Sequence, residues 1–319
     1  MSDTYTGASA LSSDQAAYNL LADFALRPQL HFDQVADVKA TAQAHQGATV
    51  KFTIYDDLAV ASTALGESTD VDAVAMSDSQ VTVTLVEYGN AVLTTAKVRG
   101  TSFLNVDADA ANIVGYNAGV SQDTIARDVL KGGSNVTYAT GGTTDPDARN
   151  KVEPEDELTA HDVRVAITSL RSANVMDWNG YYTGFIHPDV SIDLREETGA
   201  AAWRDPHTYS EPGAIWKGEI GAFEGARFVE TPRAPIFADA GSSTTLTDVY
   251  ATIFVGKQSL AKAYSSTESA STAQVVIGPI TDKLRRFHPL GWKWFGGYSI
   301  YRQAAVRRVE SASSIGANA

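Results

Sequence analysis

The chain has 319 residues, of which 44% are hydrophobic and 20% are charged, and it contains no cysteine. A chain of this length can bury a large core and form two lobes, while the absence of cysteine excludes disulfides, thiolate metal sites and a cysteine nucleophile. No stretch approaches the roughly 20 consecutive apolar residues of a membrane helix, and no basic stretch with an apolar core begins the chain. We therefore expect a soluble protein with no membrane partner and no cleaved secretion signal.

The net charge of −13 argues against a dedicated nucleic-acid-binding protein, because phosphate neutralisation needs clustered lysine and arginine. The charges are unevenly distributed. Residues 1–96 hold twelve acidic and three basic residues, whereas residues 283–308 hold seven basic residues and no acidic one. This asymmetry suits a nucleic-acid patch or a head-to-tail contact between copies of the chain. The aromatic, strand-rich character of the basic segment favours the contact between copies.

Residues 1–46 have helical patterns but too little apolar surface for a core of their own. Ser13 or Asp14 is placed to cap a first short helix, and a second amphipathic helix is expected from Phe32 to Val38. Two short helices cannot form a core alone, so we expect an arm that packs elsewhere.

Residues 49–86 are predicted to form two strands joined by a long polar segment, residues 57–79. Apolar residues alternate along both strands and share one face: Val50, Phe52, Ile54, Val81, Val83 and Leu85. A period of two is typical of half-buried strands, and a lone two-stranded ribbon is marginally stable in water. The apolar face must therefore pack on something, and both its own domain and a neighbouring subunit remain open as partners.

After the ribbon, Gly89 and Asn90 are expected to end the strand. The strongest helical pattern follows at residues 105–131, where Asn105 is the expected N-cap and Gly132 lies at the stop. The expected apolar stripe of this helix is Val106, Ile113, Val120, Ile125 and Val129.

The second half of the chain reads as mixed helix and strand. Residues 134–154 are expected to be a loop, and Thr159 and Asp162 predict a capping box at the start of the next helix. Further helices are predicted at residues 190–197 and 259–264. Strands are predicted at 182–186, 215–220, 226–230, 249–255, 274–277, 292–300 and 304–309.

The side chains that an enzyme would need are not grouped in the sequence. The six histidines show no metal-ligand spacing: His31, His45, His161, His187, His207 and His288. No phosphate-binding loop, nucleophile elbow or calcium loop is complete. We therefore predict no catalytic, cofactor-binding or metal-binding residues, and no enzyme activity.

Three short motifs occur at the ends of predicted elements or within them. They are Glu87-Tyr88-Gly89-Asn90-Ala91-Val92 after the ribbon, Ile186-His187-Pro188 at a strand end, and His288-Pro289-Leu290-Gly291-Trp292-Lys293 near the C-terminus. Together with an arm, an extended ribbon, a long helix, an α/β lobe and closing aromatic strands, they resemble tailed-bacteriophage major capsid proteins. The motifs look like those of the capsid family that includes phages of the N4 type, and the resemblance covers nearly the whole chain.

The resemblance implies an α+β fold with five parts. They are an N-terminal arm (1–46), an extended E-loop ribbon (47–90), a peripheral lobe (91–158) with a spine helix (105–131), an axial lobe (159–273), and a return to the peripheral lobe (274–319). It also implies self-assembly into hexamers and pentamers of an icosahedral shell around double-stranded DNA, which is bound without sequence specificity. The virion capsid would then be assembled in the host cytoplasm.

Scaffolding, portal and decoration proteins are the other partners that the resemblance implies. Residues 1–46 lack the long extension that serves some relatives as a scaffold, so assembly is expected to use a separate scaffolding protein or none. An encapsulin-like compartment protein with the same fold is the main alternative, and an α/β enzyme is a weaker one. We predict that the apolar ribbon face contacts a neighbouring subunit, as do four residues of the basic segment: Arg285, Arg286, Arg307 and Arg308.

Overall fold

The computed structural model describes residues 30–41, 48–55, 58–62, 64, 67, 70, 73–102, 106–142, 145–197, 219–242, 244, 246–279 and 282–315. The helix expected after Ser13 and the N-cap expected at Asn105 lie outside these residues. In chain order the elements are η3 (Phe32–Val35), β1 (Ala36–Thr41), β2 (Thr49–Tyr55), β3 (Asp78–Thr84), β4 (Val86–Thr95), α2 (Ala96–Thr101), α3 (Val106–Lys131), β5 (Val136–Tyr138), η4 (Arg149–Lys151), α4 (Ala160–Ser172), β6 (Tyr182–Ile186), α5 (Pro188–Glu196), β7 (Glu219–Phe223), β8 (Ala226–Glu230), β9 (Ile236–Phe237), β10 (Val249–Val255), β11 (Leu260–Ser265), β12 (Gln274–Ile277), β13 (Phe287–Ile300), η6 (Gln303–Ala305) and β14 (Val306–Ser311).

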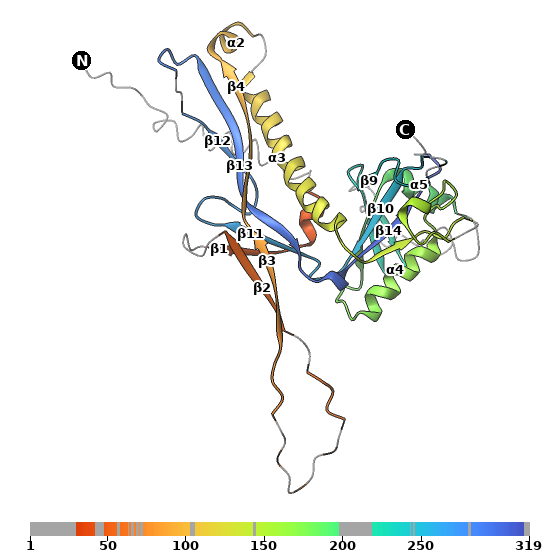
Figure 1. The fold of residues 1–319 in the computed structure, drawn as a ribbon. Coiled ribbons are helices and arrows are strands. Elements are labelled where there is room, and N and C mark those ends of the chain that lie inside the picture. The colour runs from red at the N-terminus through yellow and green to blue at the C-terminus, as the bar shows by residue number, and fades with distance from the viewer. Residues whose placement is uncertain are drawn as a thin grey trace.

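The chain forms two lobes, and a two-stranded ribbon projects from one of them (Figure 1). The first lobe is a five-stranded sheet in the order β1-β11-β13-β12, with β4 also paired to β13, and α3 packs along it. The second lobe is a seven-stranded sheet in the order β5-β14-β10-β6-β8-β7, with β9 on β10. Helices α4 and α5 pack on this second sheet. The predicted α+β class is confirmed.

The sequence predicts that the strand after the ribbon ends at Gly89 and Asn90, and this prediction is wrong. Strand β4 continues through both residues, which pair with Lys293 and Trp292 of β13. A Cβ atom at Gly89 would lie 2.7 Å from the Trp292 carbonyl oxygen. Glycine is therefore required here for the close approach of two strands and does not mark a break.

Two predicted helices are strands in the structure. The helix expected at residues 259–264 is β11, which pairs in parallel with β1 and antiparallel with β13. The helix expected from Phe32 to Val38 is the single turn η3, followed by β1. In both segments, pairing with residues distant in sequence overrides the local helical pattern.

The chain passes between the lobes more often than expected. Strand β5 forms within the predicted loop 134–154 and joins the seven-stranded sheet. Strand β11 lies in the five-stranded sheet although residues 159–273 were assigned to one lobe, and β14 returns to the seven-stranded sheet. Sheet membership depends on distant pairing partners, which a local pattern does not specify.

Helix α3 has the predicted extent, but its buried face differs from the predicted stripe. Ile113 is 62% exposed. The buried face consists mainly of small residues, including Ala110, Ala111, Val114, Gly115, Ala118, Gly119 and Ala126. Small side chains let the helix lie close to β13, whose large Trp292 and Trp294 fill the space between them. Helix α4 has the predicted capping box of Thr159 and Asp162.

A hydrophobic core continues from one lobe into the other. It joins Trp294 of the five-stranded sheet and Val114 of α3 to Phe185 and Ile253 of the seven-stranded sheet, and it includes Phe32 of η3. A second core lies beneath α4 and α5. Within the described ranges, no helix is both long and apolar enough to cross a membrane.

Candidate assembly surfaces

The base of the ribbon packs on its own chain. Four residues of its predicted contact face are buried, Val50, Phe52, Val83 and Leu85, and Ile54 and Val81 are partly buried. They pack against Ala261 and Ala263 of β11 and against Phe295 and Tyr301. The assignment of this face to a neighbouring subunit is therefore corrected, because the five-stranded lobe covers it.

Two further contacts fix the ribbon base in position. The Phe52 ring meets the Tyr301 ring edge-on at 5.3 Å, and the Tyr301 hydroxyl donates to the Thr53 carbonyl at 3.3 Å. The ribbon also crosses β13 at Gly297, where an added Cβ atom would overlap the Thr84 carbonyl oxygen. The ribbon therefore leaves the lobe in a defined direction.

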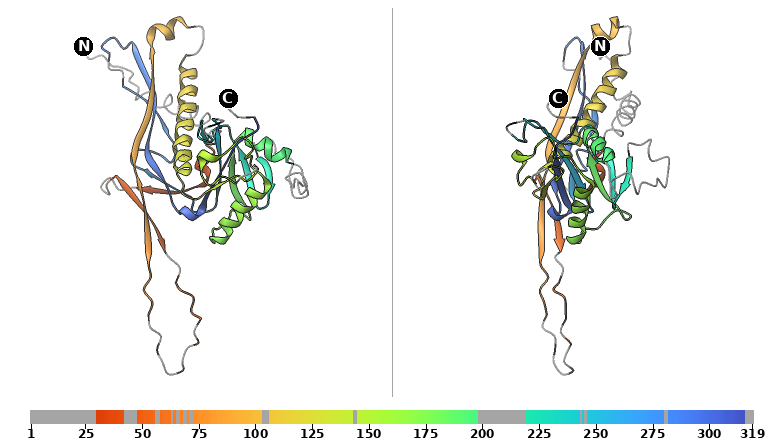
Figure 2. Two further views of the ribbon diagram at one scale, coloured as in Figure 1. Left: turned by 45° about the vertical axis from the view of Figure 1, so that its right-hand side comes forward. Right: turned by 90° about the vertical axis from the view of Figure 1, so that its right-hand side faces the viewer.

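The ribbon tip, residues 56–77, carries a different surface. Its described residues extend away from both lobes (Figures 1 and 2). Large apolar side chains there are exposed, with Val60 at 90%, Val74 at 71% and Met76 at 72%. The sequence of the tip holds five acidic residues and no basic one. The tip thus offers apolar contacts within a negative potential.

The opposite end of the five-stranded lobe is basic. This distal end consists of α2 and the turn at residues 282–286, and it lies far from the ribbon tip in Figure 1. Its five basic residues are Lys97, Arg99, Lys283, Arg285 and Arg286. They outnumber the nearby carboxylates, of which Asp107 pairs with Arg99 and Asp282 pairs with Arg286. Exposed apolar residues also lie here: Leu93, Val98 and Leu284.

The four predicted contact arginines divide into two pairs. Arg285 and Arg286 are exposed at the distal end. Arg307 is partly buried and donates to the Ser169 hydroxyl, and Arg308 is 7% exposed. Arg307 and Arg308 are therefore corrected to structural residues of the seven-stranded lobe.

Arg308 belongs to a buried ion cluster centred on Glu310. The Arg308 guanidinium donates to the Glu310 carboxylate at 2.7 Å, and Arg149 donates to both of its oxygens at 2.7 and 2.8 Å. Arg149 also stacks on Phe237, with its guanidinium carbon 3.4 Å from the ring centroid. The sequence carried a signal for this cluster, because residues two apart on a strand share a face.

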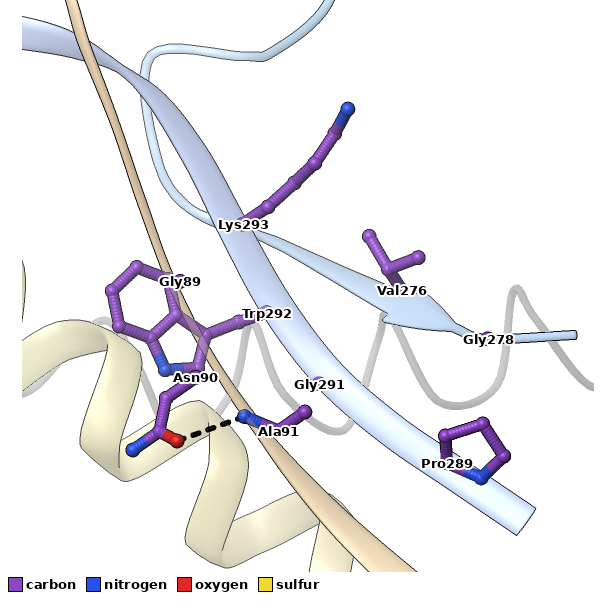
Figure 3. A pocket seen from close by; sticks show the side chains of 9 residues that line it. All are labelled: Gly89, Asn90, Ala91, Val276, Gly278, Pro289, Gly291, Trp292 and Lys293. Atoms are coloured by element: carbon purple, nitrogen blue, oxygen red, sulfur yellow. Dashed lines mark hydrogen bonds between the residues drawn. The ribbon is translucent and has the colours of Figure 1, made fainter. Parts of the chain in front are cut away.

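A shallow groove crosses strands β4, β13 and β12 (Figure 3). Its volume is about 470 Å³, and backbone at Gly89, Gly278 and Gly291 forms part of its lining. Lys293 points away from the helix, while the Trp292 ring points toward α3 (Figure 3). Sequence reasoning missed the groove, although glycines in adjacent strands, Gly89 of β4 and Gly291 of β13, are its signal.

A cluster of polar side chains at the start of α5 has residue types that also occur in catalytic sites. His187 Nδ1 lies 3.2 Å from the Asp189 carboxylate, to which the Tyr250 hydroxyl donates at 3.0 Å. Burial lowers the pKa of His187 and raises the pKa of Tyr250. His187 accepts from the Asp189 backbone N–H as the N-cap of α5. In the described part of the chain, no three His, Asp or Glu side chains are grouped like metal ligands.

Comparison with known families identifies the protein class. A family model described as phage capsid protein matches residues 8–315. The chain belongs to this phage capsid protein family. As a phage capsid protein it is a structural subunit of the virion shell and not an enzyme, and the shell is built from copies of it. No curated protein matches the sequence.

Solved capsid structures share the fold of this capsid protein. The capsid of Ralstonia phage GP4 is 14% identical, with a TM-score of 0.70 over 90% of this chain and 92% of that one. The cyanophage Pam1 capsid asymmetric unit is 15% identical, with a TM-score of 0.66 over 91% and 92%. The head of Helicobacter pylori bacteriophage KHP40 is 12% identical, with a TM-score of 0.65 over 89% and 91%.

Proposed function

We propose that this capsid protein forms hexamers and pentamers of an icosahedral shell around double-stranded DNA, in which the ribbon tip of one copy binds the distal end of the next. The separation of charge between two ends of the molecule is the main support for this contact. The acidic tip and the basic distal end lie at opposite extremes of the five-stranded lobe (Figure 1). Opposite charges at two ends of one molecule favour head-to-tail contacts, and rotation can close such contacts into rings.

The packed ribbon base supports this arrangement. The contacts of Phe52 with Tyr301 and of Val83 with the β11 surface hold the base on its own lobe. A fixed base presents the tip at a constant distance and direction, which lowers the entropy lost when the tip binds a neighbour. The exposed apolar residues on both surfaces supply contact area within the charged frame.

We assign the five-stranded lobe as the peripheral lobe, with α3 as the spine helix, and the seven-stranded lobe as the axial lobe. We assign the chain to the branch of the family that includes phages of the N4 type, and three motifs of the chain support this assignment. Residues 87–92 and 290–295 pair across β4 and β13, and Ile186-His187-Pro188 joins β6 to α5. Assembly in the host cytoplasm, with scaffolding, portal and decoration proteins as partners, completes the proposal.

A charge-reversal experiment tests the contact. Lys283→Glu with Arg285→Glu removes two positive charges from the distal end and adds two negative ones, and we expect it to abolish closed particles in electron micrographs. Lys151→Glu with Lys257→Glu is the matched control, because these exposed lysines lie elsewhere and the net change is the same. Glu67→Lys with Asp70→Lys in the tip should restore assembly to the first variant.

Two results would contradict the proposal. One is normal particles from the distal-end variant, and the other is equal loss of particles in the control. The contents of particles made with phage partners distinguish the shell types, since a phage capsid holds DNA and an encapsulin-like compartment holds protein cargo.

A further inference from the structure

The two lobes are joined without a shared sheet. No strand of one sheet pairs with a strand of the other among the described residues. The chain itself crosses between the lobes at residues 132–135, 256–259 and 301–305. Two of these crossings, residues 256–259 and 301–305, are joined to each other by backbone hydrogen bonds, such as that from the Tyr301 N–H to the Ser259 carbonyl at 3.0 Å. Hinges occur at short loop segments of this kind, so the angle between the lobes also depends on the side chains packed between them.

One short segment, residues 30–35, lies in this position and is here called the interlobe segment. Its Phe32 is completely buried. The Phe32 ring lies 4.5 Å from the Phe185 ring of the seven-stranded sheet. It belongs to the same core as Trp294 of the five-stranded sheet and Val114 of α3. The ring therefore fills space between the lobes.

The backbone of the interlobe segment is bound by Asp123 of α3, which also pairs with the seven-stranded lobe. The N–H groups of His31 and Phe32 both donate to one oxygen of Asp123, each at 2.8 Å. The other Asp123 oxygen lies 3.3 Å from the guanidinium of Arg233, which follows β8 of the seven-stranded sheet. Asp123 is 1% exposed, so these groups exclude water from a carboxylate shared by three parts of the chain.

The third attachment ties the segment to the five-stranded sheet. Both Asp33 carboxylate oxygens contact the Lys262 ammonium, at 2.7 and 2.8 Å, and the Tyr298 hydroxyl donates to Asp33 at 2.6 Å. The Lys262 side chain is fully buried. A buried ion pair has strict geometry, because removing either partner leaves an uncompensated charge.

We infer that the interlobe segment is a wedge between the lobes that sets their angle and thereby the curvature of the shell. Phe32 fills the space between the lobes, Asp33 binds β11 and β13, and Asp123 of α3 binds the backbone of the segment. The angle follows from geometry, since the segment contacts α3, β6, β11 and β13 at once. The curvature rests on the proposed function, because closure of a shell depends on the shape of each subunit.

The chain allows a clean measurement of the angle because it has no cysteine. Spin labels at Ile113→Cys on α3 and Val165→Cys on α4 report the distance between the lobes, since both side chains are exposed, at 62% and 41%. In this background, Phe32→Leu replaces the buried ring by a smaller side chain. Asp123→Asn removes the charge that pairs with Arg233 and keeps an acceptor for the two N–H groups. We expect both to broaden or shift the distance distribution, and to widen the distribution of particle diameters.

The matched control is Phe228→Leu. Phe228 is also completely buried, but it packs against Phe254 inside the seven-stranded lobe. It should lower the unfolding midpoint as much as Phe32→Leu does and leave the distance between the labels unchanged. Equal distance changes in the control and the wedge variants would overturn the wedge.

The readouts separate the wedge from the proposed function. A changed distance with unchanged particle diameters would overturn the link to curvature and leave the wedge standing. Failure of the unmodified protein to form particles even with phage partners supplied would overturn the proposed function, while the label distances would still test the wedge in the free subunit.

Discussion

The Trp292 indole N–H donates to the side-chain oxygen of Asn117 at 2.8 Å, which joins β13 to the middle of α3. Asn117 accepts a second hydrogen bond, at 3.4 Å, from the Asn90 amide of β4. The Asn90 oxygen in turn accepts from the Ala91 backbone N–H at 2.9 Å (Figure 3). One asparagine on α3 thus holds two long strands, and Trp292 is only 6% exposed.

Replacing this asparagine should be costly. Asn117→Leu leaves the buried Trp292 N–H without an acceptor, and we expect a loss of about 1–3 kcal/mol in the free energy of unfolding. Urea denaturation measures the loss. Asn112→Leu on the exposed side of the same helix is the control, and it should change stability by at most about 0.5 kcal/mol. Equal losses would show that the hydrogen bond to Trp292 is unimportant.

The Glu310 cluster predicts a larger effect. Glu310→Gln removes the carboxylate that pairs with Arg149 and Arg308, and it leaves the buried Arg308 charge uncompensated. We expect the free energy of unfolding to fall by roughly 3–5 kcal/mol. A lower thermal midpoint and a lower soluble yield would show this fall. Arg308→Glu should fail in the same way before assembly begins. A folded and stable Glu310→Gln protein would contradict the structural role given to this cluster.

The local patterns of the sequence predicted the elements whose structure is set locally. The ribbon strands, the extent of α3 and the capping box at Thr159 follow from period, composition and caps within a few residues. The interpretation of Arg307 and Arg308 as contact residues was wrong, because Arg307 donates to the Ser169 hydroxyl and Arg308 pairs with Glu310 inside the folded lobe. Net charge along the chain cannot distinguish an exposed arginine from one neutralised in a core.

The errors in secondary structure have a similar cause. The sequence Leu260–Ser265 is compatible with a helix, and it becomes a strand because β1 and β13 pair on both its sides. A lysine such as Lys262 also predicts an exposed position. In the structure it is buried and pairs with Asp33, which is 229 residues away in sequence. Partners at such separations carry no signal in a single sequence.

The crossing of the ribbon over β13 predicts a strict requirement for glycine. Gly297→Ala places a methyl group against the Thr84 carbonyl, so the ribbon base must move. We expect faster amide hydrogen exchange in β2 and β3 and fewer closed particles. Gly100→Ala in α2 is the control for hydrogen exchange, because an added Cβ there meets nothing within 4 Å; it should leave the exchange of β2 and β3 unchanged and raise stability by up to about 1 kcal/mol. Unchanged exchange in Gly297→Ala would disprove the role of this crossing.

The buried tyrosines predict loss of stability at alkaline pH. Burial, and then the nearby Asp33 carboxylate, raises the pKa of Tyr298, and burial raises the pKa of Tyr250. A phenol whose pKa is higher in the folded state stabilises the fold fully below its unfolded pKa of about 10, and this stability is lost as the pH rises further.

Thermal midpoints measured against pH test this sign. The midpoint should fall as the pH rises above about 10, and the fall should be shallower in Tyr298→Phe, because that variant has one fewer phenol to ionise on unfolding. The ultraviolet absorbance of tyrosinate should appear for these residues only when the protein unfolds. Early ionisation of Tyr298 in the folded state would contradict its burial.

The most direct test of the shell is an electron cryo-microscopy map of particles assembled from this chain, with phage partners supplied if the chain alone does not assemble. We expect closed particles in which the ribbon tip, residues 56–77, of each subunit lies against α2 and the turn at residues 282–286 of a neighbouring copy. A persistently monomeric protein, or a map in which the tip contacts only its own lobes, would contradict it.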